Sequence, residues 1–293
     1  MRKPRQIAFY GKGGIGKSTI ASNLAAAWAE AGLKVLMIGC DPKADCTRNL
    51  RGDVEVATVL DLLREKEGTK MELTETAGGK TIQLDEIVYH GYQGVLCVEA
   101  GGPEPAVGCA GRGIIVAVNL LKRLGVYDEE LDIIIYDVLG DVVCGGFGLP
   151  LRQGLADLVF IVTSADYLAI YAANNICRGI ERYAGRDGAM LGGIIYNVRG
   201  AIDDIGLVRE FARNVGSEVV GAIPSDPLIT EGELYGRTVI EHGPDSLIAA
   251  RFRDLATSIL EDREGVIPRP LSKDDLRDLA RRIRNKIREQ GRY

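Results

Sequence analysis

Residues 11 to 18 read Gly-Lys-Gly-Gly-Ile-Gly-Lys-Ser, and this octet decides the fold. It matches the pattern of Gly, four residues, then Gly-Lys-Ser/Thr, in which backbone N–H groups close around phosphate oxygens. An apolar stretch, Ile7 to Tyr10, precedes the octet, and an alanine-rich stretch, Ser18 to Ala31, follows it. We therefore expect a strand, a phosphate-binding loop and a helix whose positive end points at the phosphates.

The lysines and the serine of this loop have separate expected tasks. Lys17 should contact the β- and γ-phosphates of a nucleotide, and Ser18 should hold Mg²⁺. Lys12 lies at the outer edge of the loop, where its charge suits the nucleotide of a neighbouring subunit, so the loop also indicates a dimer. The candidate nucleotide-binding residues of this segment are Gly11, Lys12, Gly13, Gly14, Ile15, Gly16, Lys17, Ser18 and Thr19.

Size and composition limit the class of protein. The chain has 293 residues, of which 46% are hydrophobic, enough for one large α/β domain or two small ones. Its net charge of −5 gives no general attraction to nucleic acid. No apolar run approaches the ~20 residues that span a bilayer, and the N-terminus lacks the apolar core of a secretory signal. We therefore expect a cytoplasmic protein that has no membrane partner and whose overall charge does not favour nucleic acid.

Apolar runs alternate with helical patterns along most of the chain. Expected strands are Gln6–Tyr10, Lys34–Gly39, Gly94–Glu99, Asp132–Asp137, Leu158–Thr163, Leu191–Asn197 and Glu218–Ile223. Several are continuously apolar, which is typical of strands covered on both faces. The alternation predicts an α/β fold with a doubly wound, mainly parallel sheet flanked by helices. Its ligand site should lie at the carboxyl ends of the strands.

The last part of the chain differs in charge. Ile267-Pro-Arg-Pro interrupts the pattern, and Ser272 with Asp275 forms a capping box for a final helix. Residues 269–293 carry nine Lys/Arg against four Asp/Glu. This helix is amphipathic, with one apolar face made of Leu276, Leu279, Ile283 and Ile287. We divide the chain into a main domain, 1–266, and a basic tail, 267–293, which docks on its own subunit or contacts an acidic partner or nucleic acid.

Two acidic segments follow strands where a nucleotide switch needs them. Cys40-Asp-Pro-Lys-Ala-Asp45 leaves the second strand, and Asp137-Val-Leu-Gly-Asp141 leaves the fourth. Asp137 suits the Mg²⁺ side, whereas Asp41 and Asp141 suit the positioning of the attacking water. Gly140 permits the second segment to change conformation when the γ-phosphate is lost.

Two of the six cysteines lie in glycine-rich segments. Cys109 is in Gly-Cys-Ala-Gly-Arg-Gly (108–113), and Cys144 is in Val-Val-Cys-Gly-Gly-Phe (142–147). Backbone N–H groups in such loops can donate to thiolates or sulfides. A site with four cysteine ligands would need two chains, each giving this pair. The other cysteines are expected to be small buried side chains: Cys40, Cys46, Cys97 and Cys177.

Taken together, these segments closely resemble the nitrogenase iron protein family, which includes the ATP-dependent reductase subunits of tetrapyrrole-reducing enzymes. The resemblance covers roughly residues 5 to 265. Its most specific segments are Tyr10–Thr19, Cys40–Asp45, Gly101–Gly113, Tyr136–Phe147 and Tyr171–Asn175.

This resemblance implies a homodimer that hydrolyses MgATP and bridges one [4Fe–4S] cluster, with Cys109 and Cys144 of each subunit as ligands. It implies that Lys12 reaches the partner's nucleotide and that Asp41, Lys43, Asp45 and Asp141 form the hydrolytic and switching set. Asn197, Pro224 and Asp226 match the adenine-side elements, and Arg112 stands where some relatives are ADP-ribosylated. The implied partners are an upstream ferredoxin or flavodoxin and a nitrogenase or nitrogenase-like catalytic component.

The catalytic component is left open by departures from the nitrogen-fixing pattern. The segment Leu149-Pro-Leu-Arg-Gln-Gly-Leu155 lacks the charged stretch usual there, and it belongs to the face that meets the partner. The terminal substrate is therefore N₂, a tetrapyrrole or a carbon–sulfur bond. The alternative class is a partitioning or positioning ATPase of the ParA/MinD type, which shares the two-lysine loop but gives no reason for Cys109 and Cys144.

Overall fold

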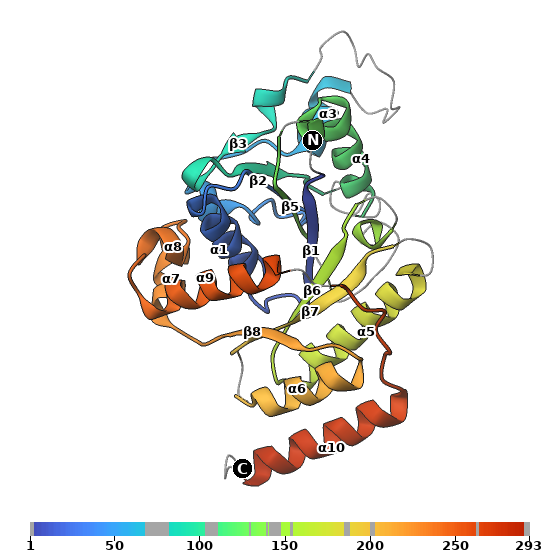
Figure 1. Ribbon diagram of the computed structural model, residues 1–293. Helices are drawn as coiled ribbons and strands as arrows, with labels where there is room; N and C mark the ends of the chain where they lie inside the picture. Colours follow the sequence, from blue (N-terminus) through green and yellow to red (C-terminus); the bar gives the residue numbers. More distant parts are fainter. Residues whose placement is uncertain are drawn as a thin grey trace.

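The computed structural model describes residues 3–67, 82–102, 111–128, 130–138, 140, 148–152, 155–184, 188–199, 203–261 and 264–289. They form one sheet in the order β3-β4-β2-β5-β1-β6-β7-β8 (Figure 1). The strands are β1 (Arg5–Gly11), β2 (Val35–Gly39), β3 (Tyr89–His90), β4 (Leu96–Glu99), β5 (Ile133–Asp137), β6 (Leu158–Thr163), β7 (Met190–Asn197) and β8 (Val219–Ile223). The predicted fold class and all seven expected strands are confirmed.

The sheet is parallel except at one edge. Only β3, among the strands described, runs antiparallel to its neighbour, pairing Tyr89 with Cys97 and His90 with Leu96. A strand of two residues shows no alternation of polar and apolar side chains, so the sequence did not predict β3. Along β1, Ile7 and Phe9 enter one hydrophobic cluster while Ala8 and Tyr10 enter the other. Because side chains alternate across a strand, apolar residues at every position require helices on both faces.

Helices cover both faces of the sheet (Figure 1). Those on the face of Ile7 and Phe9 are α1 (Lys17–Glu30), α7 (Pro227–Leu234), α8 (Val239–His242) and α9 (Leu247–Leu260). Those on the other face are α3 (Val59–Glu67), α4 (Gly111–Arg123), α5 (Tyr167–Ala184), α6 (Ile205–Asn214) and α10 (Lys273–Glu289). A short α2 (Arg48–Arg51) follows β2. None of the described helices is long and apolar enough to cross a membrane.

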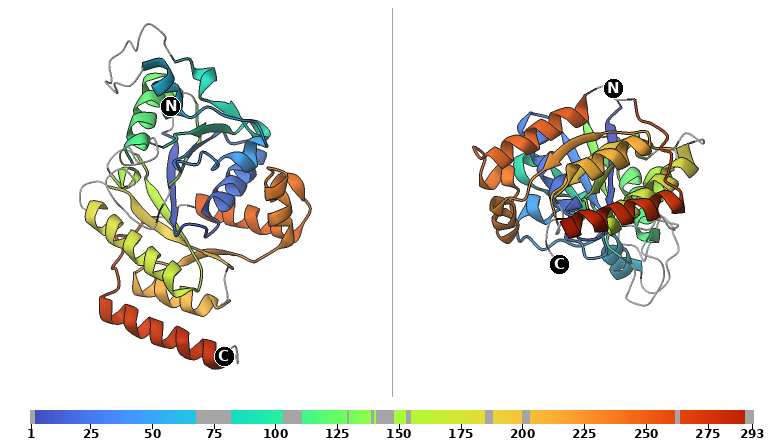
Figure 2. Two further views of the ribbon diagram at one scale, coloured as in Figure 1. Left: turned by 180° about the vertical axis from the view of Figure 1, so that it is seen from behind. Right: turned by 90° about the horizontal axis from the view of Figure 1, so that it is seen from below.

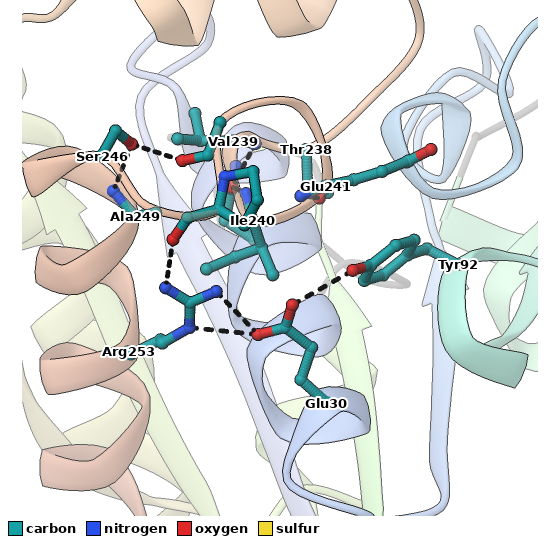
Figure 3. A network of polar contacts seen from close by, with 12 residues as sticks. Glu30, Tyr92, Thr238, Val239, Ile240, Glu241, Ser246, Ala249 and Arg253 are labelled. Carbon is teal, nitrogen blue, oxygen red and sulfur yellow. Dashed lines mark hydrogen bonds and ion pairs between the residues drawn. The ribbon is translucent and has the colours of Figure 1, made fainter.

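The helix that follows the phosphate-binding loop is held by hydrogen bonds at its C-terminal end. In α1, Trp28 Nε1 donates to the Ala256 carbonyl of α9 at 3.0 Å. At its end Glu30 accepts from the Arg253 guanidinium at 2.9 and 3.0 Å and from the Tyr92 hydroxyl at 3.1 Å (Figure 3). These bonds hold the C-terminal end of α1 against α9 and the segment before β4.

The C-terminal helix α10 lies beside α6 (Figure 2). Its start carries the predicted capping box, because Ser272 N donates to Asp275 Oδ2 at 3.0 Å and Asp275 N donates to Ser272 Oγ at 3.2 Å. Three residues of its predicted apolar face, Leu276, Leu279 and Ile283, are buried in the same cluster as α5 and α6. The structure therefore shows that the tail packs on its own subunit, which is one of the interactions that the sequence prediction left open.

Candidate functional site

The phosphate-binding loop joins β1 to α1 at the carboxyl edge of the sheet. Gly14 and Gly16 have φ angles of +74° and +88°, which favour glycine. A Cβ on Gly13 or Gly14 would meet no atom within 4 Å, so the backbone there lies open on its outer side. A Cβ on Gly16 would stand 2.5 Å from Asn197 Nδ2. The loop is thus a concave backbone cradle that fits phosphate oxygens.

Lys17 and Asp137 form a buried ion pair at the base of this cradle. Lys17 Nζ lies 2.5 Å from Asp137 Oδ1, and the two side chains are 8% and 0% exposed. Burial favours the neutral amine, but the attraction of Asp137 outweighs it and raises the pKa of Lys17 above its ordinary value. The second oxygen, Asp137 Oδ2, is buried without a hydrogen bond in the part of the chain that the structure describes. A carboxylate oxygen in that state fits a metal ion or its water shell.

The expected adenine-side residues come from β7 and the end of β8. Asn197 Nδ2 donates to the Ile15 carbonyl at 2.7 Å, which ties β7 to the phosphate-binding loop. Asp226 Oδ1 accepts from Leu228 N at 2.9 Å and so caps α7, while Pro224 is exposed just after β8. Asp226 therefore has a structural task in the chain as described, whereas Asn197 lies against the cradle itself.

The first acidic segment, followed here from Cys40 to Thr47, leaves β2 beside the cradle. Asp41 Oδ1 accepts from Lys43 N at 2.9 Å, and the Asp41 carbonyl accepts from Ala44 N at 3.0 Å. Ala44 has a φ of +55°, an unusual conformation for a residue with a side chain. This tight turn leaves Asp41 half-buried and Lys43 and Asp45 exposed. All three lie at the edge where a nucleotide would extend from Lys17.

Part of the switch and cluster segments lies outside the described residues. Cys109, Asp141 and Cys144 belong to that part, and Arg112 is described only as a backbone position in α4. Gly140 is described, with a φ of +128° and a bridge to Gly11 at the end of β1. The segment after Asp137 therefore returns to the phosphate-binding loop before it continues toward Cys144.

The four remaining cysteines are buried, as expected. Burial raises the pKa of the Cys97 and Cys177 thiols to about 12. Burial also raises the pKa of Cys40 and Cys46, with Asp137 adding to the effect on both. These thiols are protonated at neutral pH, and a protonated thiol is a poor metal ligand.

A family model for 4Fe-4S iron sulfur cluster binding proteins of the NifH/frxC family matches residues 5–286. The chain belongs to this family. Among curated NifH/frxC relatives, nitrogenase iron protein 2 of Methanothermococcus thermolithotrophicus is 53% identical over 287 residues, covering 98% of both chains. The nitrogenase iron protein of Methanococcus voltae is 51% identical and covers 98% of this chain and 99% of the relative.

The solved structures with a similar fold are nucleotide-binding proteins of lower identity. The cell division ATPase MinD of Pyrococcus furiosus has a TM-score of 0.63 and 21% identity, covering 87% of this chain and 98% of its own. A ParA family ATPase from Chlorobium tepidum has a TM-score of 0.63 and 22% identity, covering 87% and 99%. This likeness shows the fold alone.

Membership of the NifH/frxC family shows the cofactors that the resemblance implied, a [4Fe–4S] cluster and MgATP. The open cradle, Lys17 and Asp137 Oδ2, which has no hydrogen-bond partner among the described residues, fit MgATP. The family match extends to residue 286, within α10, and so reaches beyond residue 265, where the resemblance was expected to end.

Two acidic residues at this edge were missed by sequence reasoning. Glu233 of α7 accepts from Thr19 Oγ1 at 2.5 Å, and Arg199 Nη2 lies 3.8 Å from its carboxylate. Glu99 ends β4 and is 1% exposed. Glu233 lies on a helix that gives no motif signal. Glu99 did have a sequence signal, because it ends an apolar strand just as Asp137 ends β5.

Proposed function

We propose that this chain is an ATP-dependent iron protein, a reductase that couples MgATP hydrolysis to one-electron transfer into a nitrogenase or nitrogenase-like catalytic component. The observation that carries the proposal is the buried Lys17–Asp137 ion pair. It joins the lysine that should bind the γ-phosphate to the first residue of the segment leading to Cys144. Family membership and about 50% identity to nitrogenase iron proteins support the same function.

The ion pair gives ATP a way to act on the segment after Asp137. When phosphates enter the cradle, they compete with Asp137 for Lys17 Nζ, because both partners of the lysine are anionic. Asp137 then loses the Lys17 ammonium as its partner and faces the Mg²⁺ side of the nucleotide. Gly140, bridged to Gly11, lies three residues further along and can change conformation with it. Hydrolysis and phosphate release restore the original pair.

The hydrolytic step is assigned to groups around the cradle. Ser18 holds Mg²⁺, and Asp41 and Asp141 orient the water that attacks the γ-phosphate. Lys43 and Asp45 lie on the exposed turn beside Asp41, where they can change position when phosphate is bound or released. We assign Lys12 to the partner subunit's nucleotide, so the complete site requires a homodimer.

The cluster supplies a one-electron couple when bound. Cys109 and Cys144 of each subunit are the proposed ligands, and thiolates are the usual ligands of such clusters. The described cysteines are buried and protonated, which supports this assignment. Arg112, three residues after Cys109, belongs to the proposed docking face. A ferredoxin or flavodoxin is the proposed electron donor.

The deciding experiment is an anaerobic pull-down with ADP and aluminium fluoride, which stall a docked hydrolysis state. A two-subunit metalloprotein should remain bound, and its cofactor would identify the terminal substrate. Capture of DNA or a septum protein instead would favour the positioning-ATPase alternative. Iron analysis tests the ligands, since Cys144→Ser should lose the cluster and Cys177→Ala should keep it.

The hydrolytic assignment has its own test. Asp141→Asn should retain iron and MgATP binding but lose turnover, because the neutral amide no longer accepts a proton from the attacking water. ATP-driven electron transfer at the rate of the unaltered protein would refute the role of Asp141.

A further inference from the structure

Glu99 stands where two functional segments leave the sheet. It is the last residue of β4 and lies in register with Gly39, the last residue of β2. Because β2 and β4 are parallel, both chains leave at the same edge. After Gly39 comes the turn with Asp41, and after Glu99 comes the segment that continues to Cys109.

The Glu99 carboxylate fixes the far end of the Asp41 turn. Its Oε1 accepts from Thr47 N at 2.7 Å and from Thr47 Oγ1 at 2.6 Å. Arg51 completes the connection, donating to Thr47 Oγ1 at 3.2 Å and to the Ala44 carbonyl at 3.1 Å. Thr47 is the N-cap residue immediately before α2, so Glu99 sets where the turn ends.

A second contact joins the same two segments. A Cβ on Gly102 would lie 2.4 Å from Pro42 Cβ, so the backbone after Glu99 packs directly on the turn. On its other side, Gly101 has a φ of +78°, and a Cβ there would lie 2.3 Å from Thr58 Oγ1. This segment cannot shift toward either neighbour without displacing it.

An acid at this position is not explained by packing. Glu99 Oε2 is buried and lacks a hydrogen bond among the described residues, which is costly for a carboxylate. The amide oxygen of a glutamine could also accept the Thr47 bonds. The ionisable groups that interact with Glu99 are Arg51 of α2, Asp137 of β5, and the thiols of Cys40, Cys46 and Cys97.

The carboxyl group can therefore change charge under ordinary conditions. Burial raises the pKa of Glu99 to about 7, against the opposing effects of the Thr47 hydrogen bonds and Arg51. An ionised Glu99 binds Thr47 through charge-assisted hydrogen bonds, which are stronger than those of the neutral acid.

We propose that Glu99 is a positioning residue that couples the nucleotide-side turn, Asp41 to Thr47, to the segment leading to Cys109. This proposal rests on the proposed function, because that function assigns the turn to the nucleotide and the other segment to the cluster. It is a second connection, separate from the one through Asp137. A movement of Asp41 is transmitted through Thr47 and Pro42 to the strand end and glycines that precede the cluster ligand.

The test compares hydrogen-exchange protection of residues 96–102 with and without a non-hydrolysable MgATP analogue, in anaerobically prepared full-length protein. In the unaltered protein the nucleotide should change this protection. In Glu99→Ala the nucleotide-induced change in the exchange rate should be about tenfold smaller than in the unaltered protein, which is the size of a typical coupling between sites. The control Asn174→Ala also removes a buried side chain with two hydrogen bonds, here to Leu271, and should keep the full response.

A second variant separates coupling from loss of structure. Glu99→Gln keeps an acceptor for Thr47 but cannot ionise, so its nucleotide response should be the same at pH 6 and pH 8, whereas that of the unaltered protein should be larger at pH 8. An undiminished response in Glu99→Ala, or the same pH profile in Glu99→Gln and the unaltered protein, would overturn the proposal. Absence of iron or nucleotide binding in the unaltered protein would refute the proposed function instead.

Discussion

Replacing Glu99 with glutamine should raise stability at alkaline pH relative to the unaltered protein. In the unfolded chain this carboxyl ionises near its ordinary pKa of 4.5, whereas burial raises the pKa to about 7 in the fold. Between these values the folded protein retains a proton that the unfolded chain has lost. The stabilisation that this raised pKa gives to the fold is fully present below pH 4.5 and is lost as the pH rises through 7. At about 1.4 kcal/mol per pH unit, the stabilisation amounts to about 3 kcal/mol.

The assay is urea unfolding at pH 5 and pH 8, followed by the fluorescence of Trp28. Trp28 is the single tryptophan of the chain and is 2% exposed, so it reports directly on loss of the core. The free energy of unfolding of Glu99→Gln minus that of the unaltered protein should increase by about 2–3 kcal/mol between the two pH values. Glu130→Gln, which changes an exposed acid, should show no such increase. A constant difference for Glu99→Gln would refute the reasoning.

Three further outcomes follow from local geometry. Gly39→Ala should lower the free energy of unfolding by roughly 1–3 kcal/mol in urea titrations, because its Cβ would stand 2.1 Å from Glu99 Oε2 and 2.6 Å from Cys46 Cβ. Ser272→Ala should cost about 1 kcal/mol by removing the cap of α10, and Ser272→Thr should restore most of it. Asp137→Asn should remove the charge that holds Lys17, so calorimetry should detect tighter binding of ATP without Mg²⁺ and a smaller gain when Mg²⁺ is added.

The sheet was predictable because its signals are local. Continuous apolar runs such as Ile133–Tyr136 can be strands only where helices cover both faces, and the phosphate-binding loop gave the position of β1 and α1. The two-residue β3 was not predictable, since its pairing with β4 depends on the sheet edge that it joins.

The candidate site was predictable only where residue type and chain position coincide. Lys17 and Asp137 are 120 residues apart. Lys17 was identified from the phosphate-binding loop motif, and Asp137 from its position at the carboxyl end of a strand. Glu233 reaches Thr19 from α7, a contact that depends on the packing of α7 and α8 near α1. Glu99 showed the same pattern as Asp137, but its importance depends on Thr47 folding back over it, which the sequence does not specify.

The burial of the four described thiols has a consequence for assembly. Iron binds thiolate, and a sulfur whose pKa is near 12 offers almost none at neutral pH. In the folded protein these four thiols are therefore poor ligands for iron. Each buried cysteine is withdrawn from competition for iron, from scrambled disulfides and from oxidation. The fold in this sense selects where an inorganic centre is built by removing the alternatives rather than by strengthening the chosen ligands.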